Sequence, residues 1–394
     1  MASVAVAVAA TKLKRRGRVG KVAGGVVPRC APAGALLAAA LALPGMLPAT
    51  AEAQAAPDQG VVQLNYLNYR DWQPGQSRMK VESPSLYALY PVSDTWVVEG
   101  TLVYDAMSGA SPFFFNTLSG ASVGDYRTAG DVKVTKYLGS YAVSVGGVVS
   151  SEQDFLSRGG SVGLQLFSDD RNRTWSFQFG GNADVINPIN EVVVDAKRYT
   201  LEFMVGVTQN LSPTQIIQSN ITYSRGHGYF NDPYKSLDQR PDHRNVVAWL
   251  TRYNQYFAAY DGTLRLGYRL LSDSFGSVSN TLDVAWVQAL PWEFSVTPAF
   301  RYYTQSAANF YANPTFPKGY PGEDGLYTAD TRLAAFGAWT AGATITKLLE
   351  KGWSLTFRGN FYRQKPSWRL GGNGSPDIES FSARWLEFGI AKTF

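Results

Sequence analysis

Alternation of apolar and polar residues with a period of two is the feature that most constrains the fold of this chain. After residue 60, segments of about 10 to 14 residues carry apolar side chains at every second position and polar or small ones between them. Successive side chains of a β-strand point to opposite faces, so the pattern predicts strands rather than helices. The clearest segments are 141–149, 175–180, 199–208, 263–270 and 353–360.

The aromatic residues favour a membrane over a soluble sandwich, whose one-sided sheets would alternate in the same way. The 21 Phe, 22 Tyr and 10 Trp residues all follow residue 60. Trp96, Trp175, Tyr199, Trp292 and Trp353 stand at predicted strand starts beside short turns, where a membrane barrel carries a girdle of interfacial aromatics. No stretch after residue 60 reaches the 18 predominantly apolar residues of a transmembrane helix.

Short and long connections alternate between the predicted strands. Turns are predicted at 91–94, 138–140, 169–173, 209–213, 258–262, 289–292 and 347–352. Loops are predicted at 71–78, 108–125, 151–157, 185–196, 227–244, 272–277, 306–331 and 366–379. We therefore predict an all-β fold, a transmembrane antiparallel up-and-down β-barrel of about sixteen strands over residues 61–394.

Two prolines and the C-terminus add detail to this prediction. Pro84 and Pro298 fall inside predicted strands, where each removes a ladder donor, and we expect a bulge or a register shift at both. The chain ends in an alternating apolar strand closed by Phe394. This ending resembles the signal that the barrel-assembly machinery reads during biogenesis, although Lys392 stands where an apolar or aromatic residue is usual.

Residues 1–53 have the three parts of a secretory signal peptide: a basic stretch, the apolar run 35–43 and a small-residue site, with cleavage expected near 53–55. The apolar run is too short for a membrane anchor. Residues 54–60 would then be a short periplasmic segment, and the expected location is the bacterial outer membrane. The leader holds 7 of the 36 basic residues but 1 of the 31 acidic ones, which leaves the rest nearly neutral and gives no indication of nucleic-acid binding. Cys30, the sole cysteine, also lies in the leader.

Charged residues occupy the polar positions of several predicted strands, and because charges face lipid only at high cost, we expect them to line the lumen. One interpretation is a lining that selects or binds a solute. The alternative is a set of mutually neutralising pairs that fill and stiffen the barrel. These candidates are Asp131, Glu202, Arg265, Arg269, Asp283, Arg301, Arg358 and Glu387.

Both histidines, His227 and His243, fall in one predicted connection together with Asp232, Asp238 and Asp242. The spacing matches no known metal-ligand pattern, and the Asp-Pro and Gly turns indicate a loop of fixed shape instead. Neither histidine has a nucleophile or acid partner at alternating spacing, and there is no P-loop lysine. We therefore predict no enzyme activity, no metal and no cofactor.

The same connection carries a family resemblance. Gly109-Ala110-Ser111-Pro112 and the residues around the histidines resemble an uncharacterised family of bacterial outer-membrane β-barrels, domain of unknown function 3570. The resemblance extends over nearly all of the chain after the leader. It implies the fold and the location but no substrate. The loop residues that carry it are Arg225, Gly226, His227, Asn231, Asp232, Pro233, Tyr234, Lys235, Arg240, Pro241 and Arg244.

Two functional hypotheses follow. In the first, the barrel is a pore or a binding protein for a small polar solute, embedded in outer-membrane lipid, with the connection 306–331 and its prolines Pro314, Pro317 and Pro321 as candidate constriction. In the second, it is a structural outer-membrane component of an assembly or surface-display system and has no transport activity.

Overall fold

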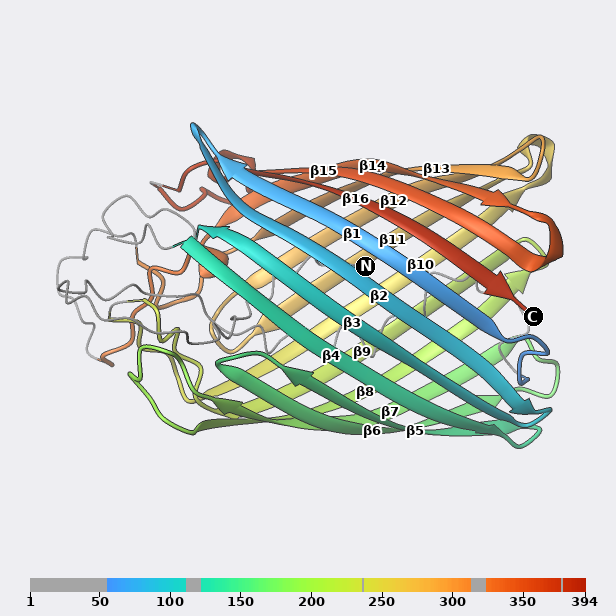
Figure 1. The fold of residues 1–394 in the computed structure, drawn as a ribbon, viewed down its shortest axis with the longest axis horizontal. Coiled ribbons are helices and arrows are strands. Elements are labelled where there is room, and N and C mark those ends of the chain that lie inside the picture. The colour runs from blue at the N-terminus through green and yellow to red at the C-terminus, as the bar shows by residue number, and fades with distance from the viewer. Residues whose placement is uncertain (1–54, 111–121, 236, 313–323, 377) are drawn as a thin grey trace, which may run out of the picture.

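A computed structural model describes residues 55–110, 122–235, 237–312, 324–376 and 378–394. The predicted signal peptide and residues 313–323 of the candidate constriction, which include its three prolines, lie outside the described residues. Sixteen strands form one closed antiparallel barrel, in which each strand pairs with its neighbours in the chain and β1 pairs with β16 (Figure 1). The predicted all-β up-and-down barrel of about sixteen strands is therefore confirmed.

The strands are 11 to 18 residues long. A strand tilted in a bilayer needs about 9–11 residues to cross it, so each strand is long enough to cross one. In chain order they are β1 Val61–Gln73, β2 Gln76–Ser93, β3 Trp96–Ala110, β4 Ser122–Tyr137, β5 Tyr141–Ser151, β6 Phe155–Phe167, β7 Arg173–Ile186, β8 Ala196–Ser212, β9 Gln215–Gly228, β10 His243–Phe257, β11 Gly262–Asp273, β12 Val278–Leu290, β13 Phe294–Gln305, β14 Phe336–Leu348, β15 Trp353–Lys365 and β16 Phe381–Thr393.

The helices of the described residues are short 3₁₀ turns, and none is long or apolar enough to cross a membrane. They are η1 Ala258–Tyr260, η2 Thr331–Leu333, η3 Glu350–Gly352 and η4 Pro366–Trp368.

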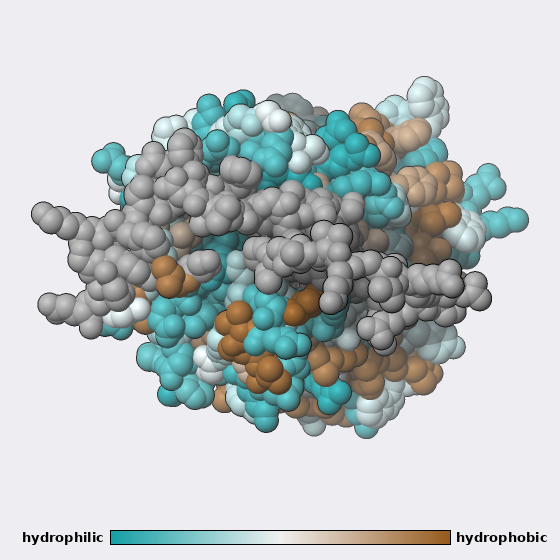
Figure 2. Space-filling view, turned by 60° about the vertical axis from the view of Figure 1, so that its left-hand side comes forward, coloured by the Kyte–Doolittle hydropathy of each residue, from teal (hydrophilic) through white to brown (hydrophobic). Residues whose placement is uncertain are grey.

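The two ends of the barrel differ. The turn end holds only short connections, together with the start of β1 and the end of β16, where Gly60 and Phe394 exchange backbone hydrogen bonds. The loop end holds the long connections, which extend beyond the strands on the left of Figure 1, and also short ones such as the β1–β2 hairpin. Figure 2 brings this end forward and shows hydrophilic surface on the loops and hydrophobic surface along part of the wall.

The alternation sorts side chains between the lumen and the outside. On β8, Leu201 is 55% exposed and Phe203 47%, while Glu202 between them is half-buried. Exposed apolar residues of this kind recur on the outward positions of most strands, including Leu64, Leu102, Val145, Ile221 and Phe388. An apolar outer surface that surrounds the barrel would be unstable in water and suits hydrocarbon.

Aromatic residues flank the turns, with one exception to the sequence prediction. Trp96, Trp175 and Trp353 begin strands at the turn end, and Trp292 lies in the turn before β13. Tyr199 instead begins β8 beside the long connection from β7, at the loop end. The two ends of the apolar band therefore both carry aromatic residues.

The prediction of a bulge or a register shift at Pro84 and at Pro298 was wrong. Pro84 pairs with Tyr66 on β1, and the β2–β3 register is the same on either side of it. Pro298 pairs with Ala343 on β14, and the β12–β13 register is likewise unchanged across it. In each case the ladder omits two residue pairs on one side. A missing N–H donor thus costs local hydrogen bonds toward one neighbour without inserting a residue.

Candidate functional site

A group of arginines lines one wall of the lumen. Residue pairing places Arg252 on β10, Arg265 and Arg269 on β11, and Arg301 on β13 on the inward-facing positions of adjacent strands. Asp283 on β12 pairs in register with both Gly267 and Arg301, which puts one carboxylate on the same stretch of wall as the four arginines. We call these five residues the arginine wall.

The charges of the arginine wall are only partly neutralised. Arg301 Nε donates to Asp283 Oδ1 at 2.5 Å. Arg252 and Arg269 lie close enough to this pair to interact with it electrostatically. The Nε of Arg269 is buried and has no hydrogen-bond acceptor among the described residues. The wall therefore carries an excess of positive charge and at least one unused donor.

A second basic group in the lumen is neutralised locally. Arg358 on β15 donates through Nη1 to Glu387 Oε2 on β16 at 3.0 Å, and through Nε to Thr344 Oγ1 at 3.0 Å. The two partners of this ion pair are directly opposite each other in the register. Such a pair fits the expectation of mutually neutralising charges, whereas the arginine wall does not.

Acidic residues lie on other strands of the lumen. Asp131 on β4 is paired in register with Thr101 on β3, and β4 is eight strands away from β12 in the closed barrel. Glu99 on β3 is ion-paired with Lys133 and accepts a hydrogen bond from Tyr87 Oη at 3.0 Å. Glu202 on β8 lies between Gly180 and Ser224 on its neighbouring strands. Asp131 and Glu202 thus lie on strands away from the arginine wall, and the lysine on the Asp131 side is paired with Glu99.

At the loop end, the motif loop between β9 and β10 is tied to the loop between β13 and β14 by a buried ion network. Arg240 Nη2 contacts Asp238 Oδ2 at 2.8 Å and Asp330 Oδ2 at 3.0 Å. Arg332 Nη2 reaches Asp232 Oδ2 at 2.9 Å and also pairs with Asp330. Gln239 and Tyr327 exchange two backbone hydrogen bonds of 2.8 Å. We call these two loops together the loop assembly.

The network shifts the pKa values of its members in opposite directions. Burial alone would raise the pKa of Asp330, but the charges of Arg332, Lys235 and Arg240 outweigh it and hold this pKa well below its usual value. Burial raises the pKa of Asp238 although Arg240 opposes the shift. Burial alone would lower the pKa of Arg240, but the charges of Asp330 and Asp238 outweigh burial and raise this pKa above its usual value. Arg240 therefore stays charged.

Tyr234 of the motif loop connects the loop assembly to two further connections. Its hydroxyl donates to Asp154 Oδ2 in the β5–β6 connection at 2.8 Å and accepts from the backbone N–H of Ile189 at 3.2 Å. Asn190 Nδ2 donates to the carbonyl of Pro233 at 2.7 Å. Pro233 and Tyr234 therefore join the motif loop to the β5–β6 and β7–β8 connections. The ion network joins the same motif loop to the β13–β14 loop.

A small aromatic core lies under the loop assembly. Phe275 from the β11–β12 connection is 2% exposed and packs edge-on against Phe230 and Phe310, with ring centroids 6.0 and 5.0 Å apart. Arg244 at the start of β10 covers the Phe275 ring at 4.8 Å and donates through Nε to Asp273 Oδ2 at 3.0 Å. This core gives the loop assembly a fixed shape.

The remaining motif residues take several positions. Asn231 Oδ1 accepts from the backbone N–H of Arg240 at 2.7 Å, and Lys235 N–H donates to the carbonyl of Asp232. A side chain at Gly226 would stand 2.7 Å from the Phe230 ring, which explains the glycine. Pro241 ends the connection just before β10. Arg225 and His227 belong to the outward-facing positions of β9, beside Ile221 and Tyr223.

The predicted boundaries of the motif connection were too wide. Strand β9 continues to Gly228 and β10 begins at His243, so both histidines lie in strands and are register partners. His243 Nδ1 contacts Asp242 Oδ1 at 2.9 Å on the exposed surface. No three potential metal ligands converge in the part of the chain that the structure describes.

The sequence pattern missed several members of these sites. Val247 and Trp249 are exposed at the outward-facing positions of β10, and Arg252 belongs to the alternate, inward-facing series. The period-two pattern alone would therefore have placed Arg252 in the lumen. Asp330 and Arg332 follow no periodic segment, and their pairing with the motif loop spans about ninety residues or more of sequence. All eight charged residues proposed for the lumen occupy inward-facing positions of their strands.

Comparison with protein families gives one match. A family model described as "Protein of unknown function (DUF3570)" matches residues 33–122, 117–197 and 190–385, which together cover most of the chain. No curated protein matches significantly.

Several solved structures are similar at low identity. A "Bacterial polysaccharide outer membrane secretin" is 6% identical with a TM-score of 0.48, over 85% of this chain and 98% of that one. OccK11 (OpdR) of Pseudomonas aeruginosa is 9% identical with a TM-score of 0.45, over 85% and 96%. CdiB from Acinetobacter baumannii is 10% identical with a TM-score of 0.46, over 84% and 60%.

Proposed function

We propose that this chain, which belongs to the DUF3570 family of proteins of unknown function, is an outer-membrane β-barrel whose lumen passes or binds small polar solutes and prefers anions. The predicted leader, the apolar outer surface and the C-terminal strand support the location. A barrel of sixteen strands is wide enough for an aqueous channel unless a loop enters it.

The arginine wall is the observation that carries the preference for anions. Four guanidinium groups on β10, β11 and β13 face one carboxylate, Asp283. Guanidinium groups remain charged at any physiological pH and present several donors to carboxylate or phosphate oxygens. Fixed positive charge on a channel wall raises the local concentration of anions and excludes cations.

Planar-bilayer recording of the purified protein under a KCl gradient tests the proposal. We expect channel events whose reversal potential indicates anion preference, and a shift toward cations in the double variant Arg265→Glu and Arg269→Glu. Arg173→Gln, which changes an outward-facing residue at the turn end, is the matched control and should leave the reversal potential unchanged.

Two results would contradict the proposal. Channel events with an unchanged reversal potential in the double variant would show that the arginine wall does not face the conducting path. Absence of channel events from correctly folded wild type, together with no binding of small anions, would favour a structural component of the outer membrane. Heat-dependent mobility on gels and fractionation with the outer membrane check folding and location independently.

A further inference from the structure

The outward face of the barrel near the loop end carries a row of three cationic side chains. Arg384 on β16 is the register partner of Arg70 on β1, and Arg70 is the register partner of Lys80 on β2. Phe361 on β15 continues the row on the other side of Arg384. All four positions have the same facing as exposed apolar residues of their strands, such as Leu64 on β1 and Leu386 on β16.

Within the described residues, this row lacks sufficient negative charge. Glu82 is paired with Lys80 at 2.5 Å and lies within electrostatic range of Arg70. Arg70 and Arg384 are both exposed, and neither forms an ion pair at salt-bridge distance with a carboxylate that the structure describes. Like charges directly opposite each other on neighbouring strands destabilise a sheet. An external anion bound to Arg70 and Arg384 would therefore stabilise the arrangement.

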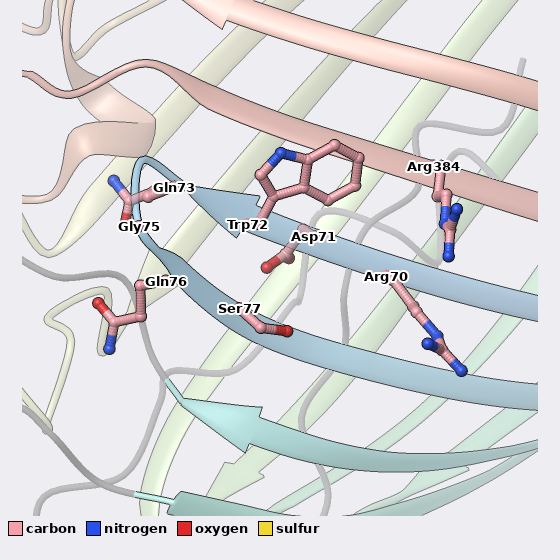
Figure 3. A pocket seen from close by; sticks show the side chains of 8 residues that line it. All are labelled: Arg70, Asp71, Trp72, Gln73, Gly75, Gln76, Ser77 and Arg384. Atoms are coloured by element: carbon pink, nitrogen blue, oxygen red, sulfur yellow. The ribbon is translucent and has the colours of Figure 1, made fainter.

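The surroundings of the row indicate what kind of anion fits. Figure 3 shows Arg70 and Arg384 with Trp72, Ser77 and the β1–β2 hairpin, which line a groove on the barrel. Asp71 also lines this groove, but its carboxylate is buried and accepts hydrogen bonds from Tyr69 and the backbone N–H of Met79. The Trp72 ring lies 5.9 Å from that of Phe361, which in turn lies 5.5 Å from Trp339. Aromatic rings beside cationic residues, next to an apolar wall, are typical of the layer where lipid headgroups meet hydrocarbon.

Basic residues at the turn end provide a contrast. Lys136 lies 4.8 Å from the centroid of Trp96, Lys347 lies 4.6 Å from that of Phe294, and Lys392 lies 5.7 Å from that of Trp353. Each of these lysines lies beside its own ring, and Lys347 and Lys392 also donate to the backbone carbonyls of Trp292 and Lys351 in the turns. They do not form a cross-strand row.

From these observations we propose that Arg384, Arg70 and Lys80 form a binding site for the phosphate groups of a lipid headgroup in the leaflet around the loop end. Guanidinium groups bind phosphate oxygens in bidentate fashion, and Arg70, Arg384 and Trp72 line one groove in which a headgroup phosphate would meet both arginines. The proposal rests on the membrane location of the barrel but not on a channel, so a failure of one leaves the other intact.

Lipid retention by the purified protein tests the site. Wild type and the variants are loaded with lipid A, or with lipid A from which the phosphates have been removed, and the bound lipid is measured by native mass spectrometry after detergent washing. We expect the double variant Arg70→Gln and Arg384→Gln to retain phosphorylated lipid A on the order of tenfold less than wild type. Lys347→Gln and Lys392→Gln, the matched double variant at the turn end, should retain it as wild type does.

A stability measurement separates ligand binding from a structural role. Without phosphorylated lipid, the Arg70 and Arg384 double variant should melt at the same temperature as wild type or higher, because it loses a like-charge repulsion. With lipid A, wild type should gain stability and the variant should not. Equal retention of phosphorylated and dephosphorylated lipid would overturn the proposal. So would retention that the double variant leaves unchanged, or displacement of lipid A by millimolar inorganic phosphate.

Discussion

Arginine and aspartate occur both in the loop assembly and on the arginine wall, but the two regions use them differently. In the loop assembly Asp330 is 2% exposed, and its oxygens accept hydrogen bonds from Arg240 and Arg332. On the arginine wall, Arg265 is exposed to the lumen, and the one carboxylate, Asp283, forms its ion pair with Arg301. A buried charge must be paired where it lies, whereas a charge in contact with water can remain available to a solute. The same residue types thus hold loops together in one place and face a solute path in the other.

Exchanging arginine for alanine in each region should give the largest contrast. Arg240→Ala leaves the buried carboxylate of Asp238 without its main partner and removes one of the two arginines bound to Asp330, which we expect to cost the loop assembly about 3–5 kcal/mol. Arg265→Ala should change stability by only about 0.5 kcal/mol, because the side chain is exposed to the lumen. Amide hydrogen exchange over 229–242 and 324–335 measures the effect of Arg240→Ala, and exchange over β11 measures that of Arg265→Ala. Equal protection in the two variants would remove the distinction between the regions.

The hydroxyl of Tyr234 should show the next largest effect. Tyr234→Phe removes one donor to the Asp154 carboxylate and one acceptor for Ile189, so we expect the joined connections to lose about 1.5–3 kcal/mol. Faster hydrogen exchange in 187–195, with the strands unaffected, is the expected readout. Tyr260→Phe is the control, since Tyr260 is 68% exposed in a turn. A change confined to the strands would contradict the role of Tyr234 as a connector.

Acid should affect the loop assembly in two opposite steps. The raised pKa of Asp238 means that its contribution to stability is present at low pH and lost as pH rises through that pKa. The lowered pKa of Asp330 means that its contribution is present above the ordinary value of 3.8 and lost as pH falls toward its own lower pKa. Protection of 229–242, corrected for intrinsic exchange, should therefore be greatest near pH 4. Asp330→Asn should remove the loss at lower pH, and persistence of that loss would exclude Asp330 as its source.

The smallest effect is expected from an exposed charge in the same loop. Asp242 contacts His243 on the surface, with side chains 72% and 61% exposed. Water screens such a pair, so Asp242→Asn should leave hydrogen exchange in 229–242 unchanged. A loss of protection comparable with that of Tyr234→Phe would show that position in the loop, rather than burial, decides which charges matter.

The strands could be predicted from the sequence because alternation depends only on which side of the wall each side chain of a single strand faces. Tyr199, Leu201 and Phe203 face outward because each strand alternates between hydrocarbon and lumen, and no knowledge of its neighbours is needed. The same rule would have placed Arg252 in the lumen. Pro84 and Pro298 were misjudged because the missing donor affects one neighbouring strand, and the sequence does not tell which neighbour that is or whether it can do without the bond.

By itself, the sequence determined the fold class, the count of strands, the alternation of turns and loops, and the side of the wall on which each strand residue lies. These depend on the spacing of residues within single segments, and hydrophobic periodicity records that spacing directly. The tertiary structure alone decided that Arg240 meets Asp330 and that Arg384 stands opposite Arg70. Both contacts join segments far apart in the chain, because closing the barrel brings its first and last strands together and folds its loops over one end, which no local pattern encodes.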